Sequence, residues 1–138
     1  MKIQEAVLNS IIKHSLAELP YESCGYLAKK GEIITKHYEL TNTDKAADHF
    51  SMDPKEQFAA IKDMRSLGVE LCAVYHSHPE TPARPSEEDI RLAYDPNVSY
   101  VIISLADNEC DIKAFNINQG SVEAEKIKII PEPCKKEI

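Results

Sequence analysis

The 138-residue sequence lacks the features that mark several large classes of protein. It has no tryptophan, only four glycines, and no apolar run long enough to cross a bilayer as a helix. Its 16 lysines and arginines are outnumbered by 23 acidic residues, which gives a formal net charge of −7. This balance argues against nucleic acid and anionic membranes as partners, because both are bound through clustered basic side chains.

Cysteines are few and widely spaced. The four of them, at positions 24, 72, 110 and 134, form no CxxC pair, which disfavours a structural zinc site made of cysteines. The N-terminal residues lack the apolar core of a secretory signal, so we predict a cytoplasmic protein without a disulfide framework. Cys72 and Cys110 lie in apolar runs and are predicted to be buried.

Helical and strand patterns alternate over a length typical of one domain. Apolar spacing and proline or glycine breaks predict helices over residues 5–20, 53–68 and 86–96. Strands are predicted in a hairpin over 22–42 and over the ranges 69–79, 98–106, 110–117 and 121–130, with a turn at Asp107-Asn108. We therefore expect one α/β domain over residues 1–130, with a mixed, mostly antiparallel sheet flanked by helices, and a loose tail over 131–138.

One stretch, AVYHSHPETPARPSEEDI at residues 73–90, gathers side chains that carry chemistry. His76 and His78 end a predicted strand, and they share a face because strand side chains alternate. A stiff loop with three prolines leads to a helix that begins near Ser86, and Asp89 falls in its first turn. Its carboxylate can swing back towards the histidines. Two histidines and one aspartate suit Zn²⁺ with a fourth position open for water.

Ser86 and Asp89 also have an ordinary explanation. The S-x-x-D spacing is close to a capping box, in which a serine caps the helix and an acid lies near its positive end. The two roles are compatible. A catalytic zinc site needs a proton acceptor as well, and Glu22 in PYESCGYL is a candidate. From position alone, an exposed surface carboxylate explains Glu22 equally well.

Together these residues resemble the motif of the JAMM metallopeptidases, also called MPN+ domains. That motif is an upstream glutamate, His-Ser/Thr-His, seven residues, serine, two residues and aspartate. Glu22, His76-Ser77-His78, Ser86 and Asp89 match it at every position. The segments ESCGYL, HFSMDP and YHSHPETPARPSEEDI are similar to the compact bacterial branch, so the likeness covers most of the chain.

The resemblance implies a fold related to cytidine deaminases and a role for each motif residue. His76, His78 and Asp89 would bind zinc, Glu22 would act as general base and then general acid, and Ser86 would help hold an oxyanion. The family hydrolyses peptide or isopeptide bonds, typically just after the Gly-Gly tail of a ubiquitin-like protein. Because segment 79–85 is short, the chain is most similar to bacterial members that act on sulfur-carrier proteins, and we expect such a carrier as its substrate.

Three alternatives remain. A cytidine-deaminase-like enzyme needs H-x-E and P-C-x-x-C, whereas the chain has His76-Ser77-His78 and no second cysteine after Pro133-Cys134. A non-catalytic MPN scaffold module resembles the chain but has lost metal ligands, all of which are present here. A DNA-repair-associated member of the superfamily is disfavoured by the net charge of −7.

The remaining polar residues near the motif are expected to be structural. His14 and His37 are predicted to face solvent, and His49 to be a structural loop residue that could border the cleft. Tyr75 and Ser77 are predicted to point away from the metal, into packing.

Overall fold

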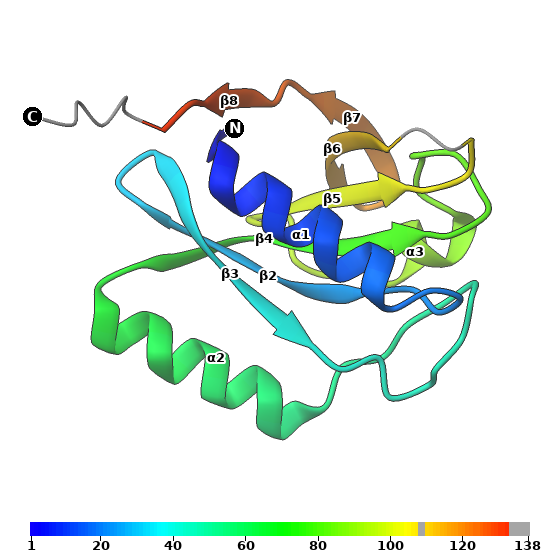
Figure 1. The fold of residues 1–138 in the computed structure, drawn as a ribbon, viewed down its shortest axis with the longest axis horizontal. Helices are drawn as coiled ribbons and strands as arrows, with labels where there is room; N and C mark the ends of the chain where they lie inside the picture. The colour runs from blue at the N-terminus through cyan, green and yellow to red at the C-terminus, as the bar shows by residue number, and fades with distance from the viewer. Residues whose placement is uncertain (108–109, 133–138) are drawn as a thin grey trace, which may run out of the picture.

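The computed structural model describes residues 1–107 and 110–132 (Figure 1). Within them the chain forms, in order, β1 (Lys2–Gln4), α1 (Glu5–Ala17), β2 (Cys24–Lys30), β3 (Ile33–Leu40), α2 (Pro54–Leu67), β4 (Glu70–His78), α3 (Glu87–Arg91), β5 (Ser99–Ser104), β6 (Asp111–Asn118), β7 (Ser121–Glu125) and β8 (Lys128–Ile130). The predicted turn at Asp107-Asn108 lies partly outside the described residues, and so does the predicted tail from residue 133 onward.

All the strands of the described residues join one sheet, in the order β7-β6-β5-β4-β2-β3-β1-β8. Neighbours pair antiparallel except at β4–β5, β3–β1 and β1–β8, so the sheet is mixed and mostly antiparallel, as predicted. Although β7 and β8 lie at opposite ends of this order, β8 begins three residues after β7 ends. The sheet therefore curls until its two edges approach each other (Figure 1).

The two faces of the curled sheet pack against different helices. The inner face and α1 enclose the largest core cluster, formed by Ile3, Val7, Ile11, Leu27, Ile34, Ala73, Tyr75, Val101, Ile103 and Ala114. On the outer face, α2 covers a second cluster of Cys24, Tyr26, Ala28, Leu40, Ala60 and Met64. A third cluster, Ala83, Ile102, Phe115 and Ile117, packs against Ile90 of α3. The outer face thus has helices at two places, with the end of β4 between them.

The predicted elements are present, but one predicted strand is divided, one helix is shorter, and one strand was not predicted. The strand predicted over 121–130 is two strands, because the chain leaves one edge of the sheet after Glu125 and joins the other at Lys128. The helix predicted over 86–96 ends at Arg91. Strand β1 was not predicted, because three residues are too few for a period and its pairing partners are distant in sequence. No helix in the described part of the chain has the length and apolar character needed to cross a bilayer.

Two side-chain predictions were wrong. His14 is buried on α1 rather than exposed, because its Nδ1 lies 2.7 Å from the hydroxyl of Tyr75 on β4. Cys110 is exposed rather than buried, whereas Cys72 is partly buried. His37 is half-buried beside Glu39, with 2.9 Å between its Nε2 and the carboxylate.

Gly25 lies where β2 passes closest to its neighbours. A Cβ atom there would overlap the backbone oxygen of Tyr38 and lie 2.5 Å from the ring of Tyr75. We expect Gly25→Ala to lower the free energy of unfolding by about 1–3 kcal/mol or more, because the strand backbone cannot move away. Urea unfolding measures this loss. Gly31→Asn is the control, since nothing lies within 4 Å of a Cβ there and asparagine tolerates its positive φ; an equal loss in both variants would show that overlap is not the cause.

Candidate metal centre

The last residues of β4 alternate between the two faces of the sheet. His76 pairs with Cys24 on β2 and Ile102 on β5, and its side chain lies on the outer face, as does that of His78. Ser77 points to the inner side, where its Oγ accepts a 2.8 Å hydrogen bond from the backbone N–H of Ser23. Both histidines are buried, and the predicted inward direction of Tyr75 and Ser77 is confirmed.

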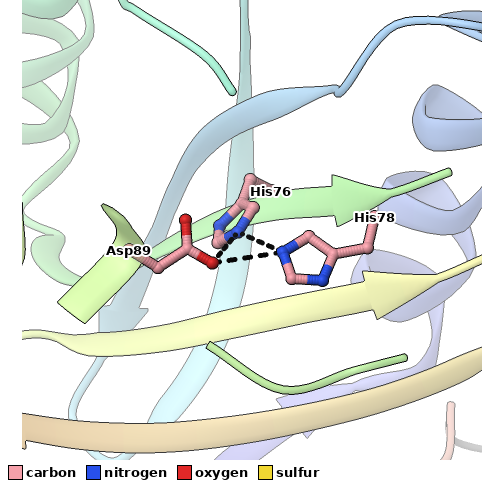
Figure 2. A group of neighbouring side chains, drawn as sticks. All are labelled: His76, His78 and Asp89. Carbon is pink, nitrogen blue, oxygen red and sulfur yellow. Dashed lines mark hydrogen bonds and ion pairs between the residues drawn. The ribbon is translucent and has the colours of Figure 1, made fainter. Parts of the chain in front are cut away.

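Asp89 meets the two histidines at a single point (Figure 2). Its Oδ2 lies 3.1 Å from His76 Nε2 and 3.1 Å from His78 Nε2, and the two nitrogens are 3.1 Å apart. These three atoms form a nearly equilateral triangle, made from residues on β4 and on the first turn of α3. Residues that are 11 and 13 positions apart in sequence therefore share one centre.

The triangle is close in size to the face of a tetrahedral metal site. Zinc bonds of about 2.0–2.2 Å in a tetrahedron place neighbouring ligand atoms about 3.3–3.6 Å apart, slightly more than the observed 3.1 Å. Three protein ligands would leave a fourth position on a zinc ion for water or substrate, as in catalytic rather than structural zinc sites. Among the described residues, this group has the donor atoms and the spacing to hold a metal ion.

The predicted capping box of α3 is present and orients Asp89. Ser86 Oγ accepts from the backbone N–H of Asp89 at 3.0 Å, and Asp89 Oδ2 accepts from the backbone N–H of Ser86 at 2.9 Å. Burial alone would raise the pKa of Asp89, but hydrogen bonds from His76, His78 and the Ser86 backbone outweigh it and hold the pKa well below its usual range. Asp89 is therefore an anion directed at the histidines.

His78 is fixed by a hydrogen bond at its other ring nitrogen, whereas Nδ1 of His76 is buried without a hydrogen-bond partner. His78 Nδ1 lies 2.9 Å from the carbonyl oxygen of Pro82, and because a carbonyl can only accept, Nδ1 carries the proton. Burial lowers the pKa of His78, but its hydrogen bonds to Asp89 and Pro82 raise the pKa by a larger amount, so the net shift is upward. A metal would take the place of the second proton at Nε2. The ring of His76 stacks on Phe50, with 4.8 Å between ring centroids.

Glu22 lies two residues before β2 and is buried, with 3% of its surface exposed. The alternative of an exposed surface carboxylate is therefore wrong. Its Oε1 has no hydrogen-bond partner. Burial is the main cause that raises the pKa of Glu22, which reaches about 8. The charge of His78 lowers this pKa by a smaller amount, and the negative charge of Asp89 raises it by a smaller amount. A buried carboxyl group with a free oxygen and a pKa near neutrality is suited to accept and return a proton.

A cavity of about 330 Å³ opens beside the triangle on the outer face. His76 and Asp89 lie at one end of it, and its other walls are mostly apolar, with Tyr26, Val74 and Ile102 among them. His49 also lines this cavity, with its side chain 40% exposed and its Nδ1 2.9 Å from Asp48. The prediction that His49 could border the cleft is confirmed.

The curled sheet, the strand-end histidines and the helix-borne aspartate together define a domain built around a candidate metal site. A model of one family, the prokaryotic homologs of the JAB domain, matches residues 4–118. The chain belongs to this family, as its resemblance to the JAMM proteins predicts.

Curated relatives are similar over nearly the whole chain. The CysO-cysteine peptidase of Mycobacterium tuberculosis is 27% identical over 133 residues, covering 94% of this chain and 91% of the relative. A probable TtuB-protein conjugate cleaving protease of Thermus thermophilus is 31% identical over 119 residues, covering 86% and 76%.

Solved structures confirm the fold. The solution structure of protein DSY2949 from Desulfitobacterium hafniense is 42% identical, has a TM-score of 0.87, and is aligned over 96% of this chain and 94% of that one. AF2198, a JAB1/MPN domain protein from Archaeoglobus fulgidus, has a TM-score of 0.66 at 21% identity, with 94% and 99% of the chains covered. The second likeness shows the fold alone, which is the JAB1/MPN fold.

The buried carboxyl group of Glu22 makes a prediction about pH. The pKa of Glu22 is about 8 in the folded protein and near its ordinary value of 4.5 when unfolded, so between these values the folded state binds more protons. Stability of the chelator-treated protein should therefore fall as pH rises from 5 to 8. Glu22→Gln removes this contribution, and we expect its stability relative to wild type to increase by about 3 kcal/mol between pH 5 and pH 8.

Urea unfolding of both metal-free proteins at pH 5 and pH 8 measures the difference. Glu123→Gln, on the exposed surface of β7, is the matched control for the loss of one carboxyl group. If Glu22→Gln differs from wild type by the same amount at both pH values, the proposed burial of an ionisable carboxyl group at this position is contradicted.

Proposed function

We propose that the protein is a zinc-dependent peptidase or isopeptidase that cleaves after the C-terminal Gly-Gly of a ubiquitin-like sulfur-carrier protein. The observation that carries the proposal is the 3.1 Å triangle of His76, His78 and Asp89 together with the buried, unpartnered oxygen of Glu22. A purely structural metal site has no need of a buried carboxyl group with a raised pKa beside it.

Each residue of this chain has a separate task in that reaction. His76, His78 and Asp89 would hold the metal, and zinc, when bound, lowers the pKa of water and polarises a carbonyl group. Glu22 would take the proton from the attacking water and return it to the leaving amine. Ser86 Oγ accepts from Asp89 N–H, so the proton of its own hydroxyl is free to donate to the oxyanion that develops on the substrate carbonyl.

The proposed substrate rests on the relatives and on the site. Two relatives are named a CysO-cysteine peptidase and a probable TtuB-protein conjugate cleaving protease, which supports a protein conjugate as the substrate. A Gly-Gly tail has no side chains, so its backbone can approach a metal ion in a narrow site. We propose that residues 1–130 form the whole metallopeptidase domain.

A non-catalytic scaffold role is the alternative. It predicts that the metal-ligand positions have lost their function, whereas all three side chains converge on one point here. The buried Glu22 would also have no purpose in a scaffold, where its burial opposes folding above pH 5.

Intact-mass spectrometry tests the activity directly. Zinc-loaded protein is mixed with the Gly-Gly-tailed carrier proteins of the same host, each extended at its C-terminus by cysteine or by a few residues. We expect a mass loss that corresponds to cleavage after Gly-Gly. Glu22→Gln should keep zinc and lose at least about a hundredfold in turnover, because a positioned general base contributes about 10²–10⁴.

Normal cleavage by Glu22→Gln would contradict the role of Glu22. If zinc is bound but no extended carrier is cleaved, C-terminally extended carriers are not the substrates, and isopeptide-linked conjugates of the same carriers are assayed next. No cleavage of either kind of substrate would contradict the proposed function.

The ligand set is tested through zinc itself. His78→Ala removes one corner of the triangle, so we expect zinc content and activity to be lost together. Elemental analysis after dialysis measures the zinc. His37→Ala is the matched control, because it removes a histidine from β3 outside the site. Stoichiometric zinc in His78→Ala would contradict the proposed ligands.

A further inference from the structure

The loop between β3 and α2 is organised around one buried amide. Within residues 41–53, all of which the structure describes, Asn42 is the buried side chain, with 6% of its surface exposed. Its Nδ2 donates to three backbone carbonyl oxygens: Glu22 at 3.1 Å, His49 at 3.0 Å and Ala46 at 3.4 Å. Its Oδ1 accepts from two backbone N–H groups, those of Asp44 at 3.1 Å and Ser51 at 3.3 Å.

Glu22 depends on this loop because it lies outside the sheet. Strand β2 begins at Cys24, so the ladder provides no partners for the backbone of Glu22. Its N–H donates instead to Ala46 at 2.8 Å, and its carbonyl oxygen accepts from Asn42. Both backbone polar groups of the candidate base are thus bound by the same loop.

The loop also touches the metal-binding side of the site. Phe50 stacks on the ring of His76, and His49 lines the cavity beside it. The carbonyl group of His49 is one of those bound by Asn42. A single side chain therefore connects the backbone of the base to the segment that packs against a candidate ligand.

We infer that Asn42 is a positioning residue, which holds the backbone of Glu22 so that its carboxyl group stays at a fixed place relative to His76 and His78. This inference rests on the proposed function. An amide is suited to the role because it offers two donor hydrogens and an acceptor in one plane, and five backbone groups use them. Alanine would leave these groups without partners, and aspartate would lack the donors.

The experiment compares Asn42→Ala with wild type and with a control of equal stability. Ile3→Val or Ile3→Ala, on β1 away from the site, is chosen so that its melting temperature matches that of Asn42→Ala. All proteins are loaded with zinc, and their activity is assayed with the extended carrier that the wild type cleaves. We expect Asn42→Ala to keep stoichiometric zinc and a KM within twofold of wild type, while kcat falls at least tenfold and the control keeps its kcat.

A second readout does not depend on activity. Exchange of the Glu22 backbone amide proton, followed by NMR in the zinc-loaded proteins, reports whether Glu22 is still held. We expect at least tenfold faster exchange in Asn42→Ala, with the amide of Val101 in the central sheet unchanged. Unchanged exchange at Glu22 overturns the inference, and so does a kcat equal to that of the control.

The two proposals fail in different ways. If the wild type cleaves no carrier, the proposed function fails, while the exchange measurement still decides whether Asn42 holds Glu22. If the wild type cleaves and Glu22→Gln does not, but Asn42→Ala has normal kcat, the proposed function stands and the inference about Asn42 is overturned.

Discussion

The alternation of side chains at the end of β4 is the constraint on which the rest of the molecule depends. His76 and His78 face outward to Asp89, while Tyr75 and Ser77 face inward to His14 and Ser23. A shift of one residue would exchange the two sets and place imidazoles in the core. Pairing with β2 on one side and β5 on the other fixes the register, so site and core are specified by the same strand.

The site concentrates groups whose burial opposes folding. The Glu22 carboxyl group is buried with one oxygen unpaired, and the Asp89 carboxylate is partly buried between two buried histidines. Each desolvated carboxyl group is unfavourable unless it is paired, and Asp89 is paired while Glu22 is not. The apolar clusters on both faces of the sheet offset this cost, which is typical of proteins whose sites are optimised for chemistry rather than stability.

Features whose interacting residues are close in sequence could be predicted, whereas contacts between residues distant in sequence could not. The i, i+2 histidines, the capping box of Ser86 and most elements follow from local periodicity and spacing. The burial of His14 could not be predicted, because its partner Tyr75 is 61 residues away. The hydrogen bond from Asn42 to Glu22 could not be predicted for the same reason. An asparagine just after a strand is typical of a turn, and its partner is 20 residues away in sequence.

The curl of the sheet has a consequence for a chain that is still being synthesised. Strand β1 lies between β3, which follows it within 30 residues, and β8, which emerges from the ribosome more than 120 residues later. The histidines, the aspartate and the strands beside them are complete well before that. A nascent or stalled chain would therefore contain all the candidate metal-binding residues while one edge of β1 is unpaired, and that edge is a template for pairing with another chain.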